Sequence, residues 1–242
     1  MTSALLETAA PPLTRSRFRF FGRDVVLETD EPRVAQDAAR CYARFLLPWR
    51  GGSSGRNVRS EAAEPLVVRA MANGGSCAPS VQVGGRRLQL SNPTELSERA
   101  QLALVCAAAA HRHDRVVLHS GAAERNGQAI LLVGPSGWGK TTVTAALVKQ
   151  GWRYLSDEFA PITPDGHVHP FPRALRLVPP DGAEFHGRAR TPASSTGSRA
   201  RLKTTVDPED LVADCIGAPG KLRAVFLLGG CRQGRRAVPG AR

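Results

Sequence analysis

The strongest chemical signature in the sequence is one short glycine-rich segment. Gly134-Pro135-Ser136-Gly137-Trp138-Gly139-Lys140-Thr141 matches the phosphate-binding pattern G-x-x-x-x-G-K-[ST] at every fixed position. Glycines let such a loop wrap closely, so that successive backbone N–H groups point into one concavity and hold phosphate oxygens. The helix that follows adds its positive N-terminal end. We therefore predict that residues 134–141, together with Thr142, bind the phosphates of a nucleotide, with ATP as the expected cofactor.

Two side chains of this segment are expected to do more than shape the loop. Lys140 would reach the β- and γ-phosphates, and the Thr141 hydroxyl would ligate Mg²⁺. A chance match to the pattern in a chain of this length has a frequency on the order of one per cent. The apolar run 128–133 before the loop predicts a strand, and 139–150 predicts a helix, which is the context that a phosphate loop requires.

A pair of carboxylates follows the next predicted strand, 152–156. Asp157 and Glu158 stand where an acid beside a phosphate loop can hold magnesium or activate a hydroxyl. The alternative is a solvated turn, because acids commonly follow strands. The interval of 17 residues from Lys140 to Asp157 leaves room for one helix and one strand. Transporter-type ATPases place their acids much later and carry an LSGGQ-like segment, which this sequence lacks.

The elements that must position these residues fall into two predicted regions and a tail. Residues 1–114 predict a small α+β region: a hairpin over 16–29, a helix over 31–47, strands over 65–71, 80–83 and 86–90, and a long helix from Asn92-Pro93 to His111. Residues 115–230 predict the nucleotide-binding core, which we expect to be truncated. Its further strands are predicted over 115–119, 121–125, 173–178 and 223–228, with Asn126-Gly127 as a tight hairpin turn. Residues 231–242 are a basic, irregular tail.

The segment from Leu118 to Ile162 resembles the catalytic core of HPr kinase/phosphorylase and its bacterial relatives. That family places a histidine-containing strand, a hairpin, the phosphate loop, one helix and a strand ending in paired acids in the same order, and the likeness covers about residues 115–178. The resemblance implies an α/β fold with a P-loop core of the HPr-kinase/PEP-carboxykinase-like type. It does not extend to the family's regulatory domain, nor to the glycine-rich segment that carries its dephosphorylation activity.

The resemblance also implies roles for individual residues. His119 corresponds to the active-site histidine, and Asp157 to the acid that accepts the proton of the substrate hydroxyl. Glu158 stands where the family has a second Asp, as a further candidate magnesium ligand, and Thr141 replaces the commoner Ser. From the sequence pattern alone, a core histidine at a strand end is the favoured interpretation of His119, and only the resemblance favours the site.

The implied activity is that of an ATP-dependent kinase. Its acceptor would be a serine hydroxyl of a protein or of a precursor peptide of a modified natural product, with HPr itself not implied. A kinase for a small-molecule hydroxyl and a nucleotide-binding regulatory protein without turnover remain as alternatives. The resemblance is also compatible with a homo-oligomer.

Composition argues against other classes of partner. Among the 242 residues, Lys and Arg outnumber Asp and Glu by 33 to 21, giving a net charge of +12. Half of that excess follows Asp214, and aromatic residues make up only 5%, so we do not expect a nucleic-acid partner. Five cysteines without a CxxC pair favour reduced thiols, and neither a membrane span nor a signal peptide is evident. We expect a cytoplasmic protein. The basic stretch 188–203 is predicted to be a loop of undetermined role.

Overall fold

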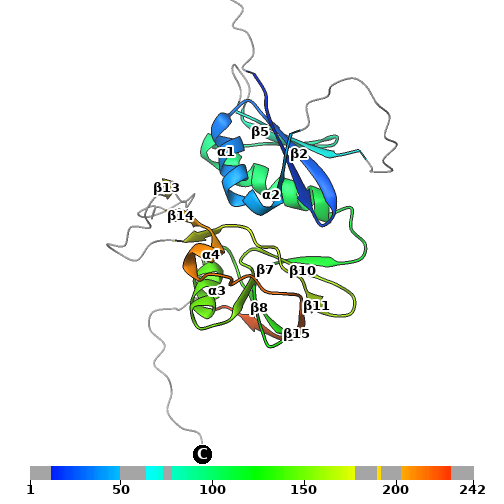
Figure 1. Cartoon of the computed structure of the whole chain (residues 1–242). Helices are drawn as coiled ribbons and strands as arrows, with labels where there is room; N and C mark the ends of the chain where they lie inside the picture. The colour runs from blue at the N-terminus through cyan, green and yellow to red at the C-terminus, as the bar shows by residue number, and fades with distance from the viewer. Residues whose placement is uncertain (1–11, 50–63, 73–77, 178–189, 192–202, 230–242) are drawn as a thin grey trace, which may run out of the picture. The chain divides into compact units, whose positions relative to one another are not determined.

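The computed structural model describes residues 12–49, 64–72, 78–177, 190–191 and 203–229. The chain divides into two compact units (Figure 1). Unit 1 comprises Met1–Val116 and Arg173–Val206, and unit 2 comprises Val117–Pro172 and Asp207–Arg242. Among the described residues, no helix is both long and apolar enough to cross a membrane.

Unit 1 is built on a six-stranded sheet in the order β3-β1-β2-β4-β5-β6. Helices α1 and α2 pack against each other, and α2 also packs against β2, β4 and β5. A second sheet has the order β12-β14-β13. The strands of this unit are β1 (Thr14–Phe20), β2 (Arg23–Thr29), β3 (Leu46–Leu47), β4 (Leu66–Met71), β5 (Ser80–Val83), β6 (Arg86–Gln89), β12 (Leu175–Leu177), β13 (Arg190–Thr191) and β14 (Lys203–Val206). Its helices are α1 (Pro32–Cys41) and α2 (Leu96–Ala109), with 3₁₀ turns at Ala43–Phe45 and Pro93–Glu95.

The helix predicted over 31–47 is wrong in its second half. Glu31 caps the start by accepting from Arg33 N, and Pro32 occupies the first turn, as the sequence leads one to expect. The helix nevertheless ends at Cys41, because the Tyr42 ring packs edge-on against Phe18 and Phe20 of β1. After the 3₁₀ turn at Ala43–Phe45, Leu46–Leu47 pair with β1 as β3. Aromatic packing thus ended a helix that periodicity alone would have extended.

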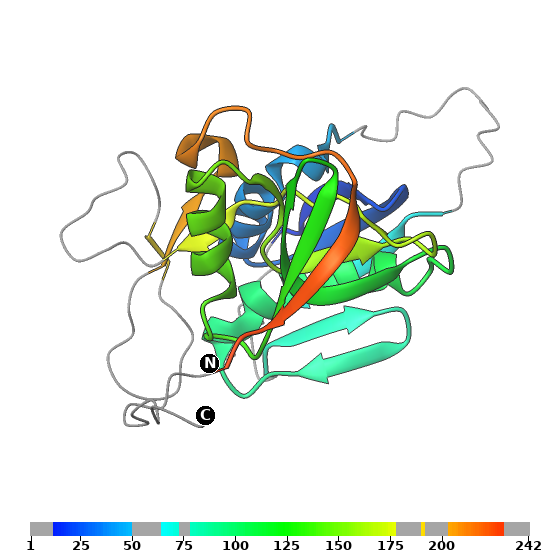
Figure 2. The ribbon, with the colours of Figure 1, turned by 90° about the horizontal axis from the view of Figure 1, so that it is seen from below.

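Unit 2 is built on a second six-stranded sheet, in the order β10-β11-β15-β8-β7-β9. In addition, β10 pairs with β7. The orange-red strand β15 lies beside the green strands in Figure 2; it pairs with β8 in parallel, and β7 runs antiparallel to both β8 and β9. The elements are β7 (Val116–Arg125), β8 (Gln128–Val133), α3 (Lys140–Lys149), β9 (Arg153–Ser156), β10 (Phe159–Ile162), β11 (His167–Val168), α4 (Pro208–Leu211) and β15 (Gly220–Leu227).

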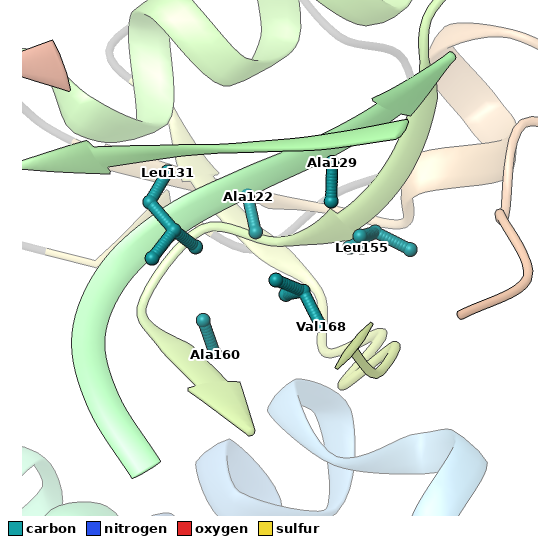
Figure 3. Close-up of a cluster of buried hydrophobic side chains, with 6 residues drawn as sticks. All are labelled: Ala122, Ala129, Leu131, Leu155, Ala160 and Val168. Carbon is teal, nitrogen blue, oxygen red and sulfur yellow. The ribbon is translucent and has the colours of Figure 1, made fainter. Parts of the chain in front are cut away.

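A small apolar cluster holds the strands of unit 2 together (Figure 3). Ala122 of β7, Ala129 and Leu131 of β8, Leu155 of β9, Ala160 of β10 and Val168 of β11 are all buried in it. Figure 3 shows these three alanines beside the larger side chains of Leu131, Leu155 and Val168. Because burial of apolar side chains is the main favourable term in folding, this cluster stabilises the packing of the strands of unit 2.

Two features of the core differ from the sequence prediction. The segments 115–119 and 121–125 are one continuous strand, β7, which passes through Gly121 without a break. Residues 173–206 group with unit 1, whereas the predicted core of 115–230 included them. The physical reason for the second difference is local: Ala174 N donates to Cys41 O at 2.9 Å, and β12 pairs with β14. Most of the basic stretch 188–203 and the tail 231–242 lie outside the described residues.

Gly121 is required by close packing between β7 and α3. A Cβ at this position would lie 2.5 Å from Thr144 Oγ1 and 3.4 Å from Leu132 Cβ. The Thr144 hydroxyl is buried and donates to Lys140 O at 2.9 Å, so it cannot move aside without losing that bond.

We expect Gly121→Ala to lower the free energy of unfolding by about 1–3 kcal/mol, because an added methyl overpacks this contact. Urea unfolding measures the change. Gly85→Ala is the matched control, since a Cβ there meets nothing within 4 Å. Equal free energies of unfolding for the two variants would show that the added methyl at position 121 is accommodated at little cost.

Candidate functional site

The phosphate-loop sequence forms a tight turn between β8 and α3. β8 ends at Val133, and residues 134–139 lead into α3, whose N-cap is Gly139. Gly137 and Gly139 have φ values of +83° and +90°, a left-handed conformation that side chains rarely tolerate. The indole of Trp138, held between these glycines, is 46% exposed. The glycine pattern therefore produces the close strand-to-helix turn that was predicted from it.

Lys140 folds back over this loop. Its Nζ donates to Gly134 O at 2.7 Å and to Pro135 O at 3.2 Å, and the residue is only 7% exposed. Burial lowers the pKa of Lys140 below its usual value of 10.5, while the negative charges of Glu158 and Asp157 act in the opposite direction. Both predicted acids are thus close enough to Lys140 to affect it electrostatically.

Asp157 connects the start of α3 to the end of β9. The Thr141 hydroxyl donates to Asp157 Oδ2 at 3.0 Å, and the Tyr154 hydroxyl donates to Asp157 Oδ1 at 3.1 Å. Asp157 is 1% exposed, so these bonds replace part of the hydration that the carboxylate loses on burial. A donor reaches each carboxylate oxygen, which fixes the orientation of the group.

A bend after β9 turns Asp157 toward the loop. β9 ends at Ser156, whose Oγ accepts from Phe159 N at 3.0 Å and from Glu158 N at 3.3 Å. In a continuous strand, the side chains of Tyr154 and Asp157 would point to opposite faces. The bend that Ser156 stabilises brings the Tyr154 and Asp157 side chains into contact.

His119 lies on β7, and its strand runs beside the acid pair. The adjacent Ser120 N donates to Glu158 O at 3.0 Å, which joins the two segments. The His119 side chain is exposed, and its ring meets that of Phe159 edge-on at a centroid distance of 6.2 Å. His119 is therefore not the buried core histidine that was the alternative from the sequence.

The structure unites most of the predicted site residues. The charges of Lys140, Asp157 and Glu158 interact, and a hydrogen bond joins Thr141 to Asp157. His119 is connected to this group through the backbone of β7. Sequence reasoning missed Tyr154. A tyrosine three residues before an acid indicates a contact between the two side chains only if the bend at Ser156 is already known.

The side chains present suit magnesium held together with a phosphate ligand. Mg²⁺ prefers oxygen ligands and is usually bound by one or two carboxylates plus substrate phosphates. A threonine hydroxyl hydrogen-bonded to a buried carboxylate beside the loop provides such oxygens. Across the described part of the chain, no cluster of three or more His, Cys, Asp or Glu side chains forms a metal site made by protein alone.

Comparison with known proteins gives two partial similarities. The family model described as SynChlorMet cassette protein ScmC matches residues 91–186, which is less than half of the chain but includes the whole stretch from His119 to Glu158. The HPr(Ser) kinase/phosphatase from Coxiella burnetii is similar over 50% of this chain and 70% of that chain, with a TM-score of 0.30 and 11% sequence identity. A structural similarity at this level identifies neither fold nor activity. The chain matches none of the curated proteins with which it was compared.

The lowered pKa of Lys140 makes a prediction about pH. A lysine whose pKa is lower in the folded chain favours folding in its neutral form. That stabilisation is complete above 10.5 and is lost as the pH falls through the lower folded-state value. Lys140→Met removes this titration, so its stability advantage over the wild type should shrink as the pH rises from 8 toward 10.5.

Urea unfolding of both proteins at pH 8, 9 and 10 measures this difference. Lys149→Met, on the exposed last turn of α3, is the control that removes a lysine from the same helix away from the loop. A difference between Lys140→Met and the wild type that stays constant over this range would contradict the effect of burial.

Proposed function

We propose that this chain is an ATP-dependent kinase that transfers the γ-phosphoryl group to a serine hydroxyl of a protein or peptide, in the cytoplasm. The observation that carries the proposal is the hydrogen bond from Thr141 to Asp157 at the N-terminus of α3, directly after the glycine-rich loop. The reduced thiols of Cys41, Cys106 and Cys215 are compatible with that compartment. The choice of a serine acceptor rests on the resemblance of residues 118–162 to HPr kinases.

The nucleotide part of the proposal follows from the loop. The backbone N–H groups of residues 134–142 and the N-terminus of α3 would bind the phosphates. The Lys140 ammonium would exchange its bonds to Gly134 O and Pro135 O for phosphate oxygens. Thr141, Asp157 and Glu158 are the candidate residues on the magnesium side, where the ion would neutralise charge on the β- and γ-phosphates.

The transfer step assigns Asp157 as the base. An ionised carboxylate has about four lone-pair positions. Thr141 and Tyr154 each donate to one oxygen of Asp157, which holds the carboxylate at the start of α3 beside the loop. The serine Oγ–H proton passes to Asp157 while the bond from Oγ to the γ-phosphorus forms. The bond from that phosphorus to the β–γ bridging oxygen breaks, and ADP leaves. His119, on the neighbouring strand β7, is the further candidate catalytic residue.

Calorimetry with Mg·ATP tests the nucleotide part directly. We expect one site per chain with micromolar affinity, of the order that enzymes show for substrates. Lys140→Ala should weaken binding strongly, because the ammonium is the cation that lies over the loop. Absence of heat with wild-type protein, at concentrations that would reveal a millimolar site, would reject the proposed function.

The acceptor part is tested with radiolabelled ATP and an array of serine peptides, each paired with its alanine counterpart. We expect label on serine peptides alone. Label on free metabolites instead would favour the small-molecule kinase. Binding of Mg·ATP without any transfer would favour the regulatory protein without turnover.

Asp157→Asn tests the base assignment. The rate of transfer to the best peptide should fall by about 10²–10⁴-fold, the usual contribution of a general base. ATP affinity measured in EDTA should stay within a few-fold of wild type, because the loop and Lys140 are unchanged. Asp165→Asn, at the exposed turn between β10 and β11, makes the same chemical change away from the loop and should leave transfer intact. Full transfer by Asp157→Asn would overturn the assignment.

A further inference from the structure

The chain places a tyrosine hydroxyl against the carboxylate that faces the phosphate loop. Tyr154 is fully buried, and its hydroxyl donates to Asp157 Oδ1 at 3.1 Å while Thr141 donates to Oδ2 at 3.0 Å. Neither the phosphate-loop pattern nor the likeness to HPr kinases assigns a role to this tyrosine. Two hydroxyl groups from two different elements therefore donate hydrogen bonds to the two oxygens of one buried carboxylate.

The backbone of Tyr154 is hydrogen-bonded on both edges of β9. Tyr154 N donates to Cys215 O at 2.7 Å, and Gly217 N donates to Tyr154 O at 2.9 Å. On its other side, Tyr154 pairs with Ala123 of β7. The phenol thus reaches Asp157 from a strand bound on both edges, whereas Thr141 reaches it from the first turn of α3. A donor fixed in this way restricts the rotation of the carboxylate around its own bond.

We infer that Tyr154 is a positioning residue, which holds Asp157 in the orientation that lets Asp157 and Thr141 together support the magnesium ion of bound Mg·ATP. The inference rests on the proposed function, because it assigns a role within the same site. Tyr154 does not touch the nucleotide in this proposal. It acts through Asp157, as residues that support metal-side ligands do.

The choice of a tyrosine has a physical reason. A carboxylate that is 1% exposed needs donors to remain ionised at low cost, and a phenol supplies one from a large, rigid side chain with few rotatable bonds. Phenylalanine at this position would preserve the packing of the ring and remove only the donor. Asp157 would then keep its bond from Thr141 but lose the one that Tyr154 donates to Oδ1.

Tyr154→Phe is therefore the test, with Tyr42→Phe as a matched control. These are the only two tyrosines of the chain. Tyr42 is equally buried in unit 1, and its hydroxyl donates to a backbone oxygen, Gln101 O, at 3.2 Å. Each variant is titrated with Mg²⁺ in the presence of a non-hydrolysable ATP analogue, and nucleotide binding is followed by calorimetry. Affinity for the analogue in EDTA is measured separately.

We expect Tyr154→Phe to raise the Mg²⁺ concentration at half-maximal effect by about 10–100-fold, the usual cost of losing a supporting contact to a metal site. Its affinity for the analogue in EDTA should match that of the wild type. Tyr42→Phe should change neither value. A Tyr154→Phe protein with the Mg²⁺ dependence of wild type overturns the inference and leaves the proposed function standing. A wild-type protein without Mg²⁺-dependent binding instead overturns the proposed function.

A second measurement keeps the hydroxyl in place and covers the case in which Tyr154→Phe does not fold. In the Tyr42→Phe background, Tyr154 is the sole tyrosine, so 3-fluorotyrosine incorporation places one fluorine beside Asp157. We expect its ¹⁹F resonance to shift on addition of Mg²⁺ to the analogue-bound protein, with the midpoint found by calorimetry. A resonance that follows the nucleotide but ignores Mg²⁺ would overturn the inference.

Discussion

The site depends on one buried carboxylate that accepts hydrogen bonds from two hydroxyl groups. Asp157 accepts one hydrogen bond from Thr141, at the first turn of α3, and another from Tyr154 of β9. A carboxylate removed from water is costly unless such donors replace its hydration. Because the donors come from different elements, satisfying this charge also sets the position of the loop relative to the end of β9.

The scaffold beneath the site is arranged around β7. This strand pairs with β8, which leads into the phosphate loop, and with β9, which leads to the acids, while β10 pairs with it as well. Gly121 lets α3 approach the same strand through Thr144. Sites built on strands and helices keep their geometry better than sites built on free loops. The residues that carry chemistry therefore follow directly from elements that share one central strand.

Local sequence signals predicted those parts of the molecule that local physics determines. Asn126 and Gly127 both adopt positive φ, as the hairpin turn predicted from their types requires. The phosphate loop and the start of α3 also lie where the glycine pattern places them. The helix over 31–47 failed because the packing of Tyr42 against β1 is a long-range contact. Tyr154 was missed for a similar reason, since its meeting with Asp157 depends on a bend that the Ser156 hydroxyl stabilises.

The bonds of Lys140 to Gly134 O and Pro135 O have a consequence for the anions that the proposed site would bind. The ammonium is already solvated by two carbonyl dipoles of its own chain, so an incoming anion gains only the difference between its attraction and theirs. A singly charged ion such as chloride offers little advantage over those dipoles. The polyphosphate of the proposed nucleotide would present several charged oxygens at once and would also engage the N–H groups of the loop. Under the proposed function, the two carbonyl bonds of Lys140 would therefore lower the affinity of the loop for a singly charged anion more than its affinity for a polyphosphate.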